Sequence, residues 1–345
     1  TLSVYAKAGT INWIRLRFTS TSSPNAYFDL QNGVIGSHSG IDAQIESVGG
    51  GWYKCSLVAN DITRVRFYPA DANGDVTHTS GNILIQDAQL EQGLVARDYI
   101  ETTTAAVEGG ITDNVPRLDY TDSSCPALLL EPQRSNIIES SEYLGDSSWI
   151  NTNLTITHNQ ATSPSGSQNA GKIVVASSGA RLENNMSITG GTNFTISVFV
   201  KKTGSGTDFD FIRLQSYKVN DGFRCWFNIT DGTKGTEGTF GSGVIVDSDI
   251  QDYGDGWYRI SITGNIPSSF PIFWIVPATA DDTNNVPVSA EYYLWGCQTE
   301  AGSYPTSYIP TYGTSVTRNK EICEVTGAAD LIGQTEGTIA GEFTF

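Results

Sequence analysis

Short apolar or alternating stretches run along the chain and are separated by turn residues, and helical periodicity is almost absent. In the second half these stretches occupy residues 195–200, 209–214, 224–229, 257–262, 271–276 and 291–295. Turn sequences such as NDG at Asn220 and DYGDG at Asp252 lie between them. About six to eight short strands at this spacing predict an antiparallel β-sandwich of the jelly-roll type.

The chain contains nearly the same pattern twice, because residues 1–98 reappear, with loops of different length, as residues 195–307. TLSVYAKAG at Thr1 returns as TISVFVKKTG at Thr195, and GWYKCSL at Gly51 returns as GWYRISI at Gly256. AQLEQG at Ala88 returns as CQTEAG at Cys297. The expected fold is therefore all-β, with tandem jelly-roll-like antiparallel β-sandwiches joined by an extended connector.

The repeat also predicts the domain boundaries. About 45 residues precede Thr195 in the second copy, counted from Trp149, and include apolar segments at Leu154 and 172–175 that the first copy lacks. We therefore expect a truncated first sandwich with open sheet edges, within an internal segment of a longer chain. The predicted parts are a first sandwich (1–98), a connector (99–148), a second sandwich (149–318) and the start of a further β domain (319–345), suggested by GTIAGEFTF at Gly337.

Composition and charge narrow the class of protein. A hydrophobic content of 39%, with 7 Trp, 15 Tyr and 14 Phe, is sufficient for sizeable cores. The net charge of -17 would repel phosphate backbones and anionic lipid surfaces, so neither nucleic acid nor a membrane is an expected partner. No apolar run approaches the roughly 20 residues of a membrane-spanning helix, so membrane insertion is not expected.

The cysteines fit a packing role. Cys55 aligns with Ile260, Cys225 with Ala26 and Cys297 with Ala88, so the other copy has a plain apolar side chain at each position. An odd count of 5 without CxxC spacing argues against a zinc site or a regular disulfide framework. It suits assembly in the reducing cytoplasm of a host cell.

The segment between the copies contains long, specific phrases. It reads NVPRLDY at Asn114, then LLLEPQRSNII at Leu128, then SSEYLGDSSW at Ser140. The second copy closes with QTEAGSYPTSYIPTYGTSVTR at Gln298. These phrases resemble the connectors and module ends of multidomain fibre and tail-appendage proteins of bacteriophages, although position 135 is Ser where that family usually has Thr.

The resemblance implies a structural component of a virion appendage, a tail or head fibre, that is homo-oligomeric and often trimeric. The partners it implies are other virion proteins and, through carbohydrate-binding-module-like sandwiches, a host cell-surface polysaccharide used in host attachment. It implies a virion location after assembly in the host cytoplasm. A concanavalin-like sandwich is a common next module in such proteins.

Aromatic residues supply the candidate receptor-binding chemistry, because sugars stack on Trp or Tyr rings while polar groups bind their hydroxyls. Trp226 aligns with Tyr27, and Arg213 with Arg15, on neighbouring predicted strands. Trp274 and Trp295 are present only in the second copy. The predicted carbohydrate site is therefore Trp226, Trp274, Trp295, Arg213, Tyr27 and Arg15.

A structural role is the alternative for each of these residues. Large aromatics dominate sandwich cores, and strand alternation does not say which face is wet. The arginines could pair instead with Glu91 and Glu300. Trp52 and Trp257, in the repeated GWY phrase, are assigned to the core or turns and excluded from the site.

Metal chemistry has a weaker signature. DANGD at Asp71 places Asp71, Asn73 and Asp75 at alternating spacing, but Gly74 falls at the fourth place, where an EF-hand needs glycine at the sixth. The resemblance implies a structural calcium in such modules, and a solvated acidic turn is the alternative. Asp247, Asp249, Asp252 and Asp255 form a second acidic loop with the same two interpretations. No other cofactor is expected.

Catalytic motifs are not evident. The 3 histidines, His38, His78 and His158, lie in polar contexts without a nucleophile elbow or an HExxH sequence. We therefore expect no enzyme in this segment. The alternative is a polysaccharide-depolymerising tail-spike enzyme whose active site lies elsewhere or is unrecognised, since glycoside hydrolysis needs only two carboxylates and 37 acidic residues are present.

Overall fold

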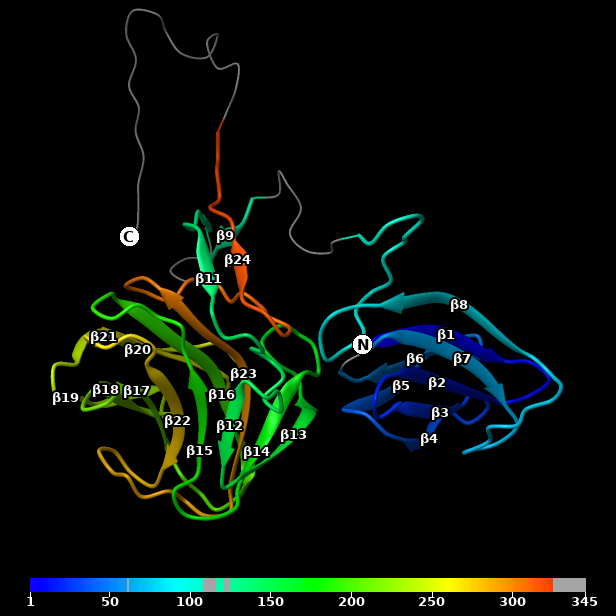
Figure 1. The fold of residues 1–345 in the computed structure, drawn as a ribbon, viewed down its shortest axis with the longest axis horizontal. Coiled ribbons are helices and arrows are strands. Elements are labelled where there is room, and N and C mark those ends of the chain that lie inside the picture. The colour runs from blue at the N-terminus through cyan, green and yellow to red at the C-terminus, as the bar shows by residue number, and fades with distance from the viewer. Residues whose placement is uncertain (61, 108–115, 121–124, 325–345) are drawn as a thin grey trace, which may run out of the picture. The chain divides into compact units, whose positions relative to one another are not determined.

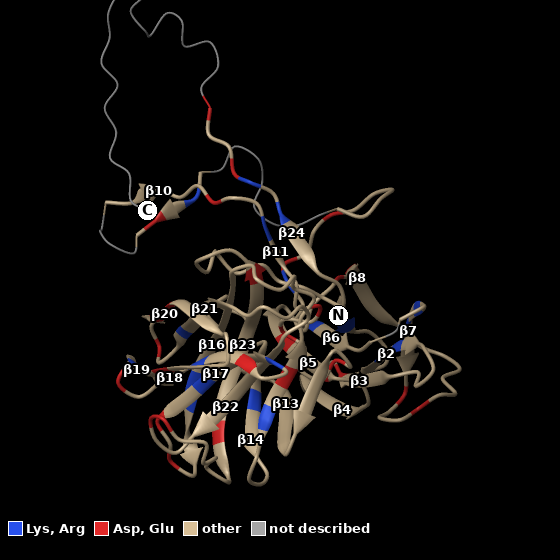
Figure 2. Ribbon diagram, turned by 60° about the vertical axis from the view of Figure 1, so that its left-hand side comes forward, with Lys and Arg blue, Asp and Glu red and all other residues tan. Residues whose placement is uncertain are grey.

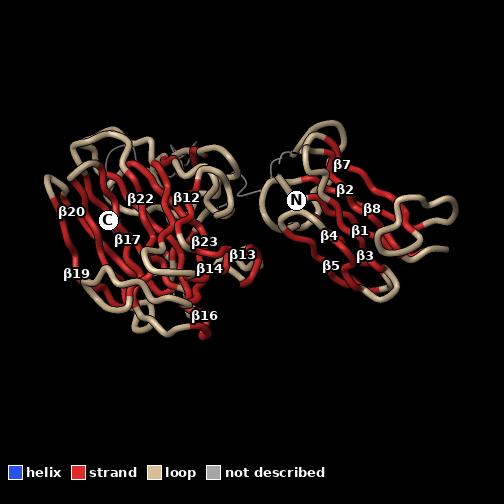
Figure 3. Tube along the Cα trace, turned by 60° about the horizontal axis from the view of Figure 1, so that its bottom comes forward, coloured by secondary structure: helices blue, strands red, loops and turns tan. Residues whose placement is uncertain are grey.

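The computed structural model describes residues 1–60, 62–107, 116–120 and 125–324 (Figure 1). Within these ranges all regular elements are β-strands, coloured red in Figure 3, which confirms the all-β prediction. The described part of the chain contains no helix long and apolar enough to cross a membrane. The predicted strand at Gly337 lies outside the described residues.

The chain divides into two compact units. One comprises Thr1–Gly110 and Ser135–Thr317 and holds both sandwiches, and the other comprises Ile111–Arg134 and Arg318–Phe345. The short strands outside the sandwiches pair as β9 (Leu118–Asp119) with β10 (Ala127–Leu128) and β11 (Arg134–Asn136) with β24 (Val316–Arg318). Part of the predicted connector belongs to the second sandwich, because Ile138 and Leu144 lie in its core.

The first sandwich consists of two antiparallel four-stranded sheets. Their facing sides form one core, in which Val4 and Ala6 of one sheet meet Ile14 and Leu16 of the other. One sheet contains, in spatial order, β5 (Asp42–Gly49), β6 (Trp52–Val58), β1 (Leu2–Ala8) and β8 (Ile83–Leu90). The other contains β4 (Val34–His38), β3 (Asn25–Asp29), β2 (Trp13–Thr19) and β7 (Arg64–Ala70).

The second sandwich consists of two antiparallel six-stranded sheets around a larger core. One sheet contains, in spatial order, β12 (Trp149–Thr152), β15 (Arg181–Asn185), β22 (Ile272–Ala278), β17 (Phe211–Lys218), β18 (Asp221–Asn228) and β19 (Thr233–Phe240). The other contains β13 (Leu154–Ala161), β14 (Ala170–Val175), β23 (Ala290–Ala301), β16 (Phe194–Gly206), β21 (Tyr258–Asn265) and β20 (Val244–Asp252).

The two sandwiches share one strand order, which confirms the tandem repeat. The order β5-β6-β1-β8 corresponds to β20-β21-β16-β23, and β4-β3-β2-β7 corresponds to β19-β18-β17-β22. The second sandwich adds β14 and β13 beyond β23, and β15 and β12 beyond β22. Among the described strands, β8 and β7 are therefore edges in the first sandwich where their counterparts are interior.

A local irregularity recurs at the same place in both copies. Asp87 in β8 and Gly296 in β23 have φ angles of 52° and 62°. At these residues the pairing register with β1 and β16 shifts, between Ser3 and Tyr5 and between Ser197 and Phe199. Such a β-bulge needs a backbone conformation that glycine adopts freely, and an aspartate tolerates it in the first copy.

The cysteines take the packing role that the repeat predicted. Cys55, Cys225 and Cys297 are fully buried, and all five thiols are free. Cys125 and Cys323 are exposed. Burial raises the pKa of Cys55 and of Cys225 to about 12, so these thiols stay protonated and behave as small apolar groups.

Candidate functional site

The strongest candidate surface is the side of the β12–β19 sheet that faces away from the core, called here the second outer face. Strand alternation sends Ile212 and Leu214 of β17 into the core. Arg213, Gln215 and Tyr217 of the same strand therefore point to the opposite side. Trp274 of β22 lies on that side too, because it pairs directly with Gln215.

Trp274 and Tyr217 are partly exposed and lie in contact, with ring centroids 4.6 Å apart and planes inclined by 63°. The Trp274 indole Nε1 donates a 2.6 Å hydrogen bond to Glu183 Oε2. Arg181 lies over the indole, with its Cζ 5.0 Å from the ring centroid, and forms a 2.8 Å ion pair with the same carboxylate. These four residues, the aromatic platform, combine two ring surfaces with charged groups that bind hydroxyls.

Trp226 also projects toward this side but is completely buried. Its Nε1 donates to the backbone carbonyl of Thr283 over 3.0 Å. The Cζ atoms of Arg213 and Arg224 lie 5.5 and 4.7 Å from its ring centroid. In this conformation the indole has no free face for a sugar.

Arg213 is itself 6% exposed and donates a hydrogen bond to the Asn284 side chain. Burial, together with the neighbouring charge of Arg224, lowers the pKa of Arg213 to about 10. Neither arginine pairs with a carboxylate among the residues that the structure describes. Excess positive charge therefore accompanies the aromatic rings on this face.

Trp295 belongs to the other sheet of the second sandwich and is 5% exposed. Its ring packs against Phe199, at a centroid distance of 5.0 Å, and Tyr308, at 4.6 Å. Trp257 lies in the same small cluster, as its assignment to the core predicts. The structure therefore separates Trp295 from Trp274 rather than bringing them into one site.

Tyr27 and Arg15 lie on the corresponding outer side of the first sandwich, on β3 and β2. Arg15 Cζ is 5.3 Å from the Tyr27 ring centroid, and the Tyr27 hydroxyl donates to the Asp75 carbonyl over 3.0 Å. Among the described residues, Arg15 and Arg213 form no ion pair with Glu91 or Glu300. Glu91 accepts a hydrogen bond from Gln89, and Glu300 accepts one from Thr306.

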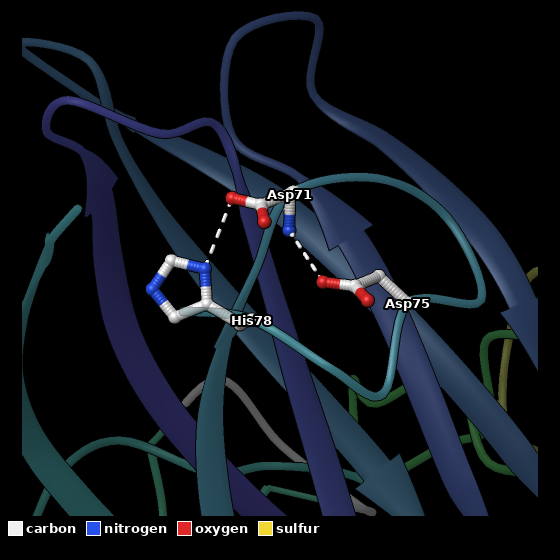
Figure 4. A group of neighbouring side chains, drawn as sticks. All are labelled: Asp71, Asp75 and His78. Carbon is white, nitrogen blue, oxygen red and sulfur yellow. Dashed lines mark hydrogen bonds and ion pairs between the residues drawn. The ribbon is translucent and has the colours of Figure 1, made fainter. Parts of the chain in front are cut away.

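The acidic turn after β7 brings together Asp71, Asp75 and His78, whose ligand atoms lie within 4.8 Å of one another (Figure 4). His78 Nδ1 lies 2.9 Å from Asp71 Oδ1, and the Asp71 backbone N–H donates to Asp75 Oδ2 over 3.0 Å. The third predicted ligand, Asn73, instead accepts from Ser37 N and Oγ at 2.8 and 2.9 Å. Two carboxylates with an imidazole nitrogen do not fit calcium, which takes six to eight oxygen ligands.

Three members of the platform were not predicted from the sequence, namely Tyr217, Arg181 and Glu183. The information needed to predict them is the register between neighbouring strands, in which Glu183 and Gln215 are the direct neighbours of Trp274 on either side. Register follows from strand pairing across long sequence separations, which a single sequence does not display.

No protein-family model and no curated protein match the chain. A solved structure to which part of the chain is similar is the enzymatically active domain of tailspike protein 4 of bacteriophage CBA120. The similarity covers 48% of this chain and 21% of that chain, at 10% sequence identity and a TM-score of 0.29.

This similarity corrects one expectation. We expected no enzyme in this segment, and the similar structure is an enzymatically active domain, so the expectation is contradicted. The absence of a recognisable catalytic motif therefore does not make this chain non-enzymatic.

Proposed function

We propose that the chain is part of a phage tail appendage and that its second sandwich binds a host-surface polysaccharide through the aromatic platform. The observation on which this proposal rests is the partly exposed Trp274–Tyr217 pair, oriented by Glu183 and Arg181. Trp274 supplies the stacking surface, Tyr217 flanks it, and Arg181 donates hydrogen bonds to hydroxyl groups.

The platform has the chemistry that sugar recognition needs. A ring held by a hydrogen bond and by a guanidinium loses little conformational freedom on binding. The aliphatic faces of a pyranose stack on such a ring, and adjacent polar groups fix its orientation. The phage setting is supported by the connector phrase at Leu128 and the closing phrase at Gln298, which resemble those of fibre and tail-appendage proteins.

Binding of purified host capsular and cell-wall polysaccharides, measured by calorimetry, tests this proposal. Wild-type protein is expected to bind at least one of them, and the Trp274→Ala/Tyr217→Ala variant to lose about tenfold or more in affinity, since aromatic stacking on both rings is removed. Equal affinity of the variant and the wild type for every polysaccharide would refute the platform.

Tyr253→Ala is a matched control. Tyr253 is 44% exposed, and it lies in the turn after β20, in the other sheet of the same sandwich. This variant should bind as wild type does. Assaying the same mixtures for new reducing ends reports whether the bound polysaccharide is also cut.

A further inference from the structure

The outer side of the β4-β3-β2-β7 sheet in the first sandwich, called here the arginine face, concentrates guanidinium groups. Strand β2 alternates Ile14, Leu16 and Phe18, which are fully buried, with Arg15 and Arg17 on the other side. Strand β7 adds Arg64 and Arg66 to the same side by the register of its pairing with β2. Figure 2 colours Lys and Arg blue along the ribbon, and blue segments lie beside the β7 label.

The pairing register places like charges next to each other. Arg17 is directly opposite Arg66, and Arg15 is directly opposite Tyr68 on one side and Tyr27 on the other. Like charges at opposed positions destabilise a strand pair. The sheet therefore holds these arginines together against their mutual repulsion.

Carboxylates do not neutralise the arginine face. Among the described residues, none of Arg15, Arg17, Arg64 and Arg66 forms an ion pair, although the chain has 37 acidic residues and 20 basic ones. Arg15 and Arg66 contact aromatic residues instead. Arg15 Cζ lies 5.6 Å from the Tyr68 ring centroid, and Arg66 Nη1 donates to the Tyr68 hydroxyl over 3.0 Å.

A further feature shows that this face favours an anion. The hydrogen bond from Arg66 and the charges of Arg17 and Arg15 lower the pKa of Tyr68, so this face stabilises negative charge at the Tyr68 oxygen.

The second sandwich shows that the fold does not need this charge. Through the shared register, Arg17 corresponds to Gln215, Arg66 to Trp274 and Arg64 to Ile272. The equivalent sheet therefore folds with neutral residues at three of the four positions. The arginines of the first sandwich consequently have a role other than completing the sheet.

We propose that the arginine face binds the anionic groups of an acidic polysaccharide. Planar guanidinium groups pair with carboxylate or sulfate oxygens through two parallel hydrogen bonds, and Tyr68 offers a ring beside them. This proposal shares with the proposed function only the assumption that the ligand is a polysaccharide. Its residues are independent, because they lie on a different sandwich from the aromatic platform.

Binding of chemically defined polysaccharides to the whole chain tests the site. The probes are alginate, which bears carboxylates, dextran sulfate, which bears sulfates, and neutral dextran. Wild-type protein should bind one or both acidic polymers and not dextran, and the affinity should fall as salt is raised. Failure to bind either acidic polymer, or equal binding of dextran, overturns the proposal.

The Arg17→Gln/Arg66→Gln variant should lose about tenfold or more in affinity for the acidic polymer. Lys7→Gln/Lys201→Gln is the matched control, because it makes the same change in charge on β1 and β16, in the other sheets. Arg17→Lys/Arg66→Lys keeps the charge without the planar fork and should give an intermediate loss. Equal losses in Arg17→Gln/Arg66→Gln and in Lys7→Gln/Lys201→Gln would mean that the overall charge of the protein, not this face, is responsible.

Two further comparisons separate this site from the aromatic platform and from a general polyanion site. Trp274→Ala/Tyr217→Ala should retain the arginine-dependent binding of the acidic polymer, so failure of the platform and failure of this site are distinguishable. Duplex DNA is the competing polyanion. If it binds as tightly as the acidic polysaccharide and with the same dependence on Arg17 and Arg66, the assignment to polysaccharide is wrong.

Discussion

The indole nitrogen of Trp274 donates a 2.6 Å hydrogen bond to the carboxylate of Glu183, across the pairing of β22 with β15. Arg181 binds the same carboxylate at 2.8 Å and covers one side of the indole. A ring that would otherwise rotate at the surface is thereby fixed. Preorganisation of this kind reduces the entropy lost when a ligand binds.

Removing this carboxylate should weaken both stability and binding. Glu183→Ala leaves the Trp274 N–H and the Arg181 guanidinium without their acceptor, so we expect a loss of about 1–3 kcal/mol in the free energy of unfolding. Urea denaturation measures it. Glu291→Ala removes a carboxylate whose ion pair with Lys172 is at the surface, and it should leave the midpoint nearly unchanged. Equal effects of the two substitutions would contradict the role assigned to Glu183.

Thiol chemistry should distinguish the buried cysteines from the exposed ones. In the native protein a thiol reagent should modify Cys125 and Cys323 only, because Cys55, Cys225 and Cys297 are fully buried and their pKa values are raised by burial. In denaturant all 5 should react. Rapid native labelling of a third thiol would show that one of the cores opens readily.

Stability should depend on pH through Glu142, a carboxyl that is 3% exposed. Burial raises the pKa of Glu142 above its usual 4.5, against the opposing effects of Arg97, Asn169 and Tyr308. The folded protein therefore holds this proton more tightly than the unfolded chain does. The associated stability is full below about pH 4.5 and is lost as the pH rises through the folded-state value.

Glu142→Gln should remove this component and raise the free energy of unfolding at neutral pH relative to wild type. Unfolding curves recorded from about pH 4, just below the usual carboxyl pKa, to about pH 8 measure the difference in slope. Glu139→Gln, at an exposed carboxyl nearby, is the control and should keep the wild-type slope. An unchanged slope in Glu142→Gln would rule out this carboxyl as the source.

The β8 edge should promote self-association. Ile85 is 48% exposed, whereas its counterpart Leu294 is fully buried beneath the pairing of β23 with β14. Exposed apolar edge strands pair with other chains, and a lysine on such an edge opposes this. Ile85→Lys should therefore reduce the concentration dependence of the sedimentation coefficient. Val76→Lys, which makes the same change in a loop outside the strands, should leave it unaltered.

Much of the fold could be predicted from the sequence. The GWY phrase and the AQLEQG phrase repeat closely enough to identify β6 and β21 as equivalent strands of the two copies, and likewise β8 and β23. The topology confirms the repeat. The apolar segments at Leu154 and 172–175 became β13 and β14, the strands that the first sandwich lacks. Local pattern sufficed where a strand alternates between core and surface, as β2 does along WIRLRFT.

The environment of each tryptophan could not be predicted in this way. Trp226 and Trp274 lie on the same side of the same sheet, but the segment containing Thr283 covers only Trp226. Trp295 is covered by Tyr308, which belongs to the closing segment of the sandwich. Loop cover depends on contacts between residues far apart in sequence, and alternation within one strand carries no information about it.

The most direct test of the proposed function is the indole N–H spectrum of the protein during titration with a host polysaccharide. The 7 tryptophans give separate indole resonances, and Trp274→Phe identifies the one at issue. We predict that the Trp274 resonance shifts with saturation while those of the buried Trp226 and Trp257 stay in place. A saturable shift confined to other tryptophans, with Trp274 unmoved, would contradict binding at the aromatic platform.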